Sequence, residues 1–278
     1  MKNYFFILIL LFVSSFSFSQ TLKIPAPSPL QTIKQDFALS FVEVNYSRPA
    51  LKGRVAFGDL VPFGKLWRTG ANAATKITFG EDVNIAGKPI KAGSYAIYVV
   101  PTAEEWEVIF NKGVANMGTS GYKKEEDALS VSVKTNKMAD KIESFMITFD
   151  NVLSDKMNLV MGWENTIVEV PISTNVDKKI MKDIDNAMNV DAKPYFESAR
   201  YYFENNKDLN KALVWINKAT ELKPKAFWMF LMKARIQFKM GDKAGAIATS
   251  KKSIELAKES NSDDYVALNE KLLKEIGE

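Results

Sequence analysis

The distribution of glycine and proline divides this 278-residue chain into two parts near residue 175. Eleven of the fourteen glycines and eight of the ten prolines precede that point, together with most of the alternation between apolar and polar residues. Glycine and proline interrupt helices and mark the turns between strands, so the first part favours a β fold and the second a helical one. We therefore expect an all-β antiparallel sandwich followed by an all-α domain of helical repeats.

Short runs with the alternation of β-strands recur through the first part, and turn residues separate them. The candidate strands are residues 37–46, 76–79, 83–85, 94–100, 106–110, 129–134, 144–149, 157–163 and 167–172. Ala86-Gly87 predicts a tight hairpin between two short strands. This spacing is typical of an antiparallel sandwich or barrel, and we expect a sandwich over residues 30–174. The proline-rich residues 20–29 form an extended lead-in in this interpretation.

The second part, residues 175–278, repeats with a period of 34 residues. At that shift Asp208 superposes on Asp242, and Ala212 superposes on Ala246. A 34-residue period with small residues where two helices cross is typical of tetratricopeptide repeats. We expect two repeats, at residues 193–226 and 227–260.

The two repeats resemble the tetratricopeptide family at positions spread over both units, although Arg200 stands where the pattern has glycine or alanine. The matching residues are Phe196, Phe203, Ala212, Ile216, Ala219 and Pro224 in the first unit and Ala234, Gly241, Asp242, Ala246 and Leu256 in the second. About three such repeats are needed to bury the helical faces of a solenoid. Apolar stripes therefore predict one capping helix before the repeats and one after them, at Val176, Ile180, Ile184 and Ala187 and at Tyr265, Leu268, Leu272 and Ile276.

The first nineteen residues have the organisation of a secretory signal peptide. Lys2 supplies a positive start, residues 4–13 are an unbroken apolar run, and residues 14–19 are rich in serine. The small residues at its end predict cleavage between Ser19 and Gln20. The apolar run is too short for a transmembrane helix, which takes about 20 residues. We expect a periplasmic or secreted protein with no transmembrane segment after cleavage.

Histidine and cysteine are both absent from the chain. Serine–histidine and cysteine hydrolases, zinc–histidine enzymes, iron–sulfur proteins and disulfide-linked folds are therefore excluded. We expect neither a cofactor nor a metal site. Carboxylates remain available for catalysis, and Asp59, Asp127 and Glu164 are the candidates. Two of them would suit a glycoside hydrolase if they lie about 5–10 Å apart across a cleft.

Arginine is rare in this chain and concentrated in one segment. Only five of the 37 basic residues are arginines, and three of them, Arg48, Arg54 and Arg68, lie between residues 48 and 68. Arginine forms bidentate bonds with carboxylates and phosphates that lysine does not match. The lysines are dispersed among acidic residues, and an exported protein does not meet nucleic acid, so we expect no nucleic-acid partner.

The run from Trp67 to Asn72 combines a flat indole ring with planar polar groups. Such a combination is suited to a sugar, a peptide terminus or a small anion, and the candidate ligand-binding residues are Arg48, Arg54, Trp67, Arg68 and Asn72. A structural interpretation explains the same residues. Trp67 would fill the core, Asn72 would shape a turn, Arg68 would pair with an acid such as Glu164, and the other two arginines would clamp a long loop to the sheet.

The helical part has its own candidates for binding a partner. Arg200, Trp215, Trp228 and Arg235 are of the residue types that anchor protein interfaces. Tryptophans in helical repeats also fill the space between helices, and that alternative stays open.

An ordered set of residues in the first part resembles the domain-of-unknown-function family 2911. The set comprises Tyr46-Ser47-Arg48-Pro49, Lys52-Gly53-Arg54, Phe57-Gly58, Leu60 to Lys65, Trp67 to Asn72, Ala92 to Tyr95, Trp106, Ile109 to Lys112, Trp163 to Thr166 and Val170-Pro171-Ile172. The resemblance covers roughly residues 30–174. It implies a domain boundary and an exported protein, and it implies no activity.

These observations favour a non-enzymatic binding or assembly protein of the periplasm or the secreted fraction. Its partner would be an envelope protein, a small molecule or a glycan, and the helical repeats would form a protein-interaction module. The alternative is a carboxylate-based hydrolase that acts on envelope polysaccharide. A third interpretation is a purely structural envelope protein in which the arginines are satisfied within the fold.

Overall fold

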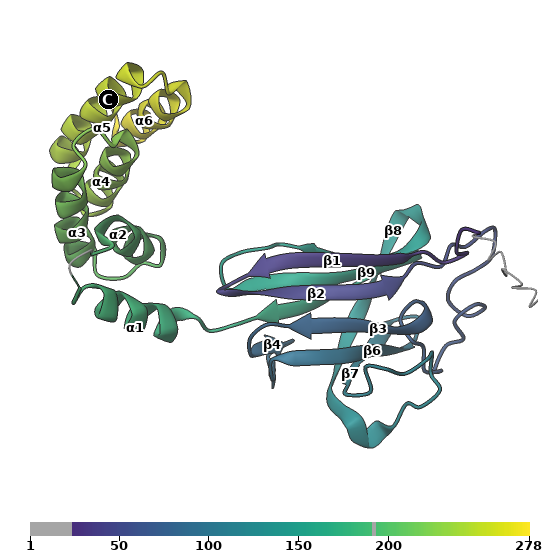
Figure 1. Ribbon diagram of the computed structural model, residues 1–278. Coiled ribbons are helices and arrows are strands. Elements are labelled where there is room, and N and C mark those ends of the chain that lie inside the picture. The colour runs from purple at the N-terminus through teal and green to yellow at the C-terminus, as the bar shows by residue number, and fades with distance from the viewer. Residues whose placement is uncertain (1–23, 191–192) are drawn as a thin grey trace, which may run out of the picture. The chain divides into compact units, whose positions relative to one another are not determined.

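The computed structural model of the chain describes residues 24–190 and 193–278 (Figure 1). The expected signal peptide, residues 1–19, its cleavage site and the beginning of the lead-in lie outside the described residues. The chain forms two compact units, the first ending at Asn175 and the second beginning at Val176. In the described parts of the chain, no helix combines the length and the apolar character needed to cross a bilayer.

The described residues of the first unit, 24–175, form a single sheet of nine antiparallel strands. The strands are β1 (Leu30–Phe37), β2 (Ser40–Ser47), β3 (Ala71–Phe79), β4 (Val83–Ile85), β5 (Lys88–Ile90), β6 (Gly93–Pro101), β7 (Glu105–Asn111), β8 (Asp127–Asp150) and β9 (Lys156–Ser173). Their order in the sheet is β1-β2-β3-β6-β7-β8-β9-β4-β5. The predicted hairpin at Ala86-Gly87 is confirmed, because it joins β4 to β5.

The sheet folds over, so that strands distant in this order face each other across the core. Tyr46 of β2 bonds through its hydroxyl to both the carbonyl oxygen of Ile147 in β8, at 3.2 Å, and the backbone nitrogen of Ile147, at 2.9 Å. The long strand β8 allows the fold, because its first part pairs with β7 and its remainder pairs with β9. The predicted all-β antiparallel sandwich is thereby confirmed.

Two details of the strand prediction are wrong. Residues 37–46 were predicted as one strand, but they contain a turn at Ala38 and Leu39 followed by β2. The strand before this turn, β1, was missed, and it pairs with β2 as a hairpin. The turn places Ala38 at a φ of 56°, a conformation that sequences usually mark with glycine or asparagine. The four strands predicted between residues 129 and 172 are only two, β8 and β9. The apparent interruption is an irregularity within the ladder, where pairing shifts between Lys137 and Ile142.

In the second unit, residues 176–190 and 193–278 form six helices, in two crossed pairs with one helix at each end. The helices are α1 (Asp177–Ala187), α2 (Tyr195–Glu204), α3 (Leu209–Leu222), α4 (Phe227–Lys239), α5 (Lys243–Glu259) and α6 (Asp263–Ile276). The 34-residue period has a direct structural meaning. Asp208 and Asp242 each accept hydrogen bonds from backbone N–H groups at the start of α3 and α5, and Ala212 and Ala246 are fully buried where the paired helices cross.

Candidate functional site

The three arginines of the first unit were expected to mark a recognition site. The structure places the side chains of two of them, Arg48 and Arg54, on backbone carbonyl oxygens. Both arginines belong to the segment that crosses from β2 to β3. Arg48 donates from Nε to the carbonyl oxygen of Phe145 in β8 at 3.0 Å. Arg54 donates from Nε to Leu51 at 2.8 Å and from Nη2 to Ala50 at 2.9 Å. Both side chains hold the crossing segment in shape.

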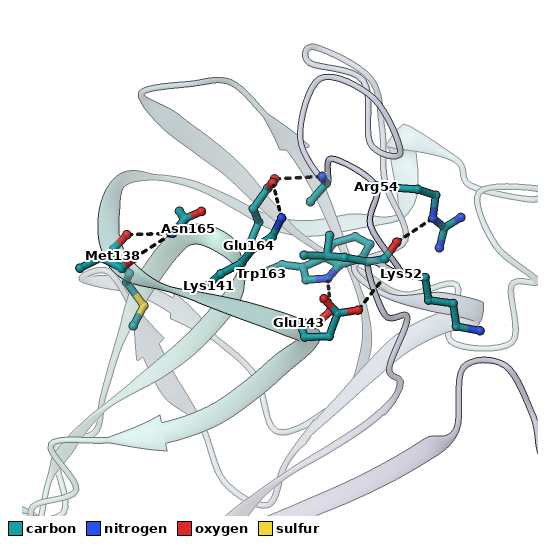
Figure 2. Close-up of polar contacts among 11 residues, drawn as sticks. Lys52, Arg54, Met138, Lys141, Glu143, Trp163, Glu164 and Asn165 are labelled. Carbon is teal, nitrogen blue, oxygen red and sulfur yellow. Dashed lines mark hydrogen bonds and ion pairs between the residues drawn. The ribbon is translucent and has the colours of Figure 1, made fainter.

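The Trp163-Glu164-Asn165 run of β9 bonds to the crossing segment through Glu164 and to β8 through its two neighbours (Figure 2). The Glu164 carboxylate accepts the backbone N–H of Ala56 at 2.9 Å through Oε2, and its Oε1 lies 3.5 Å from Nζ of Lys141. The Trp163 indole donates to the carbonyl oxygen of Glu143 at 3.2 Å. Asn165 donates its amide to two carbonyl oxygens in the irregular part of β8, those of Met138 at 3.1 Å and Ala139 at 3.3 Å.

Glu143 continues this set of contacts beside the Trp163 indole. Its Oε1 accepts the backbone N–H of Lys52 at 2.7 Å, and its backbone oxygen accepts the N–H of Leu51 at 2.9 Å (Figure 2). Backbone groups of a long irregular segment need partners once strands no longer supply them. The carboxylates of Glu143 and Glu164 fill that need, since each accepts one backbone N–H from the segment.

Trp67 lies in the core. Its side chain is 8% exposed, and its ring stacks on that of Trp163 with 5.9 Å between centroids and 15° between the planes. Its indole nitrogen donates to the carbonyl oxygen of Gly70 at 3.1 Å. A ring enclosed in this way offers no platform to a ligand, so the geometry supports the structural interpretation. Asn72 is exposed and donates its amide to Ser47 Oγ at 3.1 Å and to the carbonyl oxygen of Ser28 at 3.3 Å.

Arg68 differs from the other two arginines. Its Nε is buried and has no hydrogen-bond partner among the described residues, and the expected ion pair with Glu164 is wrong, because Glu164 pairs with Lys141. The guanidinium packs against the backbone of Gly118, where a Cβ would lie 2.5 Å from Nη1. The φ of 67° at Gly118 favours glycine, and a side chain there would also displace the Arg68 guanidinium.

The three candidate catalytic carboxylates have separate surroundings. Asp59 is exposed on the crossing segment. Asp127 accepts hydrogen bonds from Asn111 Nδ2 at 2.7 Å and from the Tyr122 hydroxyl at 2.8 Å, and it shares no hydrogen-bond partner with Glu164. Burial, followed by the bond to Asp127, raises the pKa of the Tyr122 hydroxyl above its ordinary value. In the ranges described, no group of three or more acidic side chains is placed to hold a metal ion.

The four candidate partner-binding residues of the helical unit also have different surroundings. Arg200 is exposed beside the ring of Phe196, and Trp215 is half-buried with its ring 4.8 Å from that of Tyr202. Trp228 is 38% exposed and lies edge-on to Phe227. Of these four residues, Arg235 lines a cavity.

That cavity is a groove of about 470 Å³ formed by α2, α4 and α6. Its lining residues are Phe203, Arg235, Phe238, Lys239, Leu268, Lys271, Leu272 and Glu275. Lys239 is held by Asn206 Oδ1 and lies 4.9 Å from the centroid of the Phe203 ring. Of these residues the sequence prediction marked only Arg235 for binding a partner. It placed Leu268 in the packing of the capping helix, although Leu268 is 39% exposed and lines the groove.

Comparisons with known families identify two regions of the chain. A family model described as "Protein of unknown function (DUF2911)" matches residues 28–172. A tetratricopeptide repeat model matches residues 229–260, which contain α4 and α5. Both resemblances expected from the sequence are thereby confirmed. Comparison with the curated proteins and with the solved structures finds no match.

Proposed function

This chain belongs to the DUF2911 family of proteins of unknown function, and we propose that it acts as a non-enzymatic binding or assembly protein of the bacterial envelope. In this proposal the helical unit recognises a segment of another protein, and the β unit serves as the scaffold that carries it. The signal-peptide pattern of residues 1–19 supports export to the periplasm or the medium. The tetratricopeptide repeat supports the protein-interaction role.

The groove between α2, α4 and α6 carries the proposal. Phe203, Phe238, Leu268 and Leu272 give it an apolar floor. Grooves of this kind accept the apolar side chains of a peptide, and the polar groups at their margins fix its orientation.

The charges at the groove favour an acidic segment as its ligand. Arg235 and Lys271 form no ion pair with any described residue, whereas Glu275 is the one acidic side chain in the lining. An unpaired arginine at the margin of an apolar groove is suited to a carboxylate of the partner. We therefore expect the ligand to be a peptide segment with two or more apolar side chains next to an acidic residue.

The β unit fits the scaffold role. Arg48 and Arg54 bond to backbone carbonyls, Trp67 is enclosed in the core, and the candidate carboxylates Asp127 and Glu164 are engaged in separate hydrogen-bonded groups. These contacts stabilise the crossing segment, and they favour the binding protein over a carboxylate-based hydrolase.

The test is recovery of partners from native envelope extract with the parent chain and with an Arg235→Glu/Lys271→Glu variant. Lys274→Glu is the matched control, because Lys274 lies on α6 but does not line the groove. We expect the groove variant to lose a partner that the parent and the control retain. Recovery of the same proteins by all three chains would refute the role of the groove.

A further inference from the structure

Among residues 24–190 and 193–278, no strand pairs with the outer edge of β1. β1 stands last in the sheet order and pairs only with β2 (Figure 1). It is eight residues long and contains no proline. Natural sheets usually shorten, kink or cover such an edge, because its free N–H and C=O groups can pair with another strand.

The register of the β1–β2 hairpin shows which residues of β1 direct their backbone N–H and C=O groups to the outer edge. Phe37 and Ser40 flank the two-residue turn, and residues in that position form a hydrogen-bonded pair. Along an antiparallel ladder, pairs that exchange backbone hydrogen bonds alternate with pairs that do not. The bond from Arg48 N to Pro29 O at 2.9 Å lies at a position that this alternation assigns to a bonded pair. The backbone groups of Thr32, Lys34 and Asp36 therefore point away from β2.

One of these groups is bonded by a side chain and by no neighbouring strand among the residues that the structure describes. The carbonyl oxygen of Asp36 accepts the side-chain amide of Gln35 at 3.0 Å. A side chain of the same strand thus occupies a position that a neighbouring strand would fill with a backbone N–H.

The side chains of β1 are complementary to themselves when the strand is turned antiparallel on a second copy. With Gln35 at the two-fold axis, Lys34 of each copy stands opposite Asp36 of the other, and both residues belong to the series that faces the edge. On the core side, Ile33 stands opposite Phe37 of the second copy, and the two Gln35 amides meet. Ile33 and Gln35 are half-buried in the single chain and are available for contact, whereas Phe37 is 2% exposed and stays within the core of its own copy.

The neighbouring registers lack this match. Moving the axis to Lys34 places the two Lys34 side chains opposite each other, and like charges in that position are destabilising. Moving it to Ile33 places Asp36 opposite Leu30. Asp36 has no ion pair within the described parts of the chain, so only the register centred on Gln35 supplies it with a cation.

From this complementarity we infer that the chain associates with a second copy of itself through antiparallel pairing of two β1 strands centred on Gln35. The sheets of the two copies then continue across the two-fold axis. The paired segment is short, so the buried area falls below the roughly 1,200 Å² of stable complexes and the dimer is weak. This interface is separate from the groove of the helical unit and does not depend on it.

The test is sedimentation of the purified full chain at concentrations between about 10 and about 500 µM, which span the range of weak dimers. Lys34→Asp and Asp36→Lys each place like charges opposite one another in both symmetric pairs, and each should weaken dimerisation on the order of tenfold. The double variant Lys34→Asp/Asp36→Lys restores opposite charges and should dimerise as the parent does.

Lys134→Asp is the matched control, because Lys134 is exposed on β8, an internal strand of the sheet, and should leave dimerisation unchanged. Circular dichroism of every variant verifies that the fold is retained. A parent chain that stays monomeric throughout the range would overturn the inference. So would single charge reversals without effect, or a double variant no better than either single one.

Discussion

Replacing Asn269 by leucine should destabilise the helical unit, because this side chain is the centre of a polar network between α5 and α6. Asn269 is fully buried and donates its amide to Ser253 Oγ at 3.0 Å and to the Tyr265 carbonyl oxygen at 2.7 Å. Its Oδ1 accepts the hydroxyl of Ser250 at 2.9 Å. Buried polar groups of this kind fix the register of two helices, because no other alignment satisfies them.

The expected loss in the free energy of unfolding follows from the hydrogen-bond partners that remain after the substitution. Ser253 keeps its bond to the Phe227 carbonyl oxygen at 2.7 Å, whereas the buried hydroxyl of Ser250 loses its short bond and keeps only a contact of 3.5 Å to the Asn269 backbone oxygen. A buried polar group without a good partner costs about 1–3 kcal/mol, and the second interhelical bond contributes about 1 kcal/mol. We therefore expect Asn269→Leu to lower the free energy of unfolding by about 2–4 kcal/mol.

Urea denaturation followed by far-UV circular dichroism, which is dominated by the helices, measures this loss. The matched variant is Asn269→Leu/Ser250→Ala, which removes the hydroxyl that the single change leaves unsatisfied. Replacing both partners of a buried bond is nearly neutral, so the double variant should recover about 1–2 kcal/mol. A single variant within about 0.5 kcal/mol of the parent, or a double variant less stable than the single one, would refute the reasoning.

Three further changes test other contacts. Arg48→Lys removes the Nε donor from the crossing segment and should cost about 1–2 kcal/mol in chemical denaturation, with partner recovery unchanged. Tyr122→Phe removes the hydroxyl that bonds to Asp127 and should cost about 1 kcal/mol by the same assay. The hydrogen bond from Lys207, followed by that from Tyr201, lowers the pKa of the Asp177 carboxyl. The stability that these bonds contribute is present above the unfolded pKa of aspartate, about 3.9, and is lost as the pH falls through the lower pKa of the folded state. Asp177→Asn should remove that part of the acid dependence below about pH 4 in pH-dependent unfolding.

The parts of the fold that the sequence predicted well are those with local causes. Asp208 and Asp242 cap helices through bonds to N–H groups two or three residues away, and Ala212 and Ala246 are small where helices cross. Each of these roles repeats at 34 residues and is visible in the printed sequence. The Ala38 turn was missed for the opposite reason, because its positive φ is imposed by the pairing of β1 with β2 and by no residue type at the turn.

The contacts of the candidate site could not be predicted, because their partners lie far away in the sequence. The acceptor of Arg48 is a carbonyl oxygen 97 residues away, and the N–H that Glu164 accepts belongs to a residue 108 positions earlier. Any residue has a backbone carbonyl or N–H, so the sequence contains no sign of which one is used. Leu268 was misplaced because an apolar residue on a helix stripe has the same pattern whether it faces a neighbouring helix or a groove.

The concentration of arginine between residues 48 and 68 has a physical explanation in this structure that needs no ligand. The segment crosses from β2 to β3 without a strand of its own, and its backbone groups need partners that a ladder would otherwise supply. Arg54 bonds to two carbonyl oxygens at once, which the fixed fork of a guanidinium permits and a lysine ammonium does not reproduce. Arginine enrichment in a loop therefore indicates either recognition of an anion or support of an irregular backbone. The acceptor distinguishes the two. For Arg48 and Arg54 the acceptors are carbonyl oxygens of the chain itself, whereas Arg235 and Lys271 in the groove have no acceptor among the described residues.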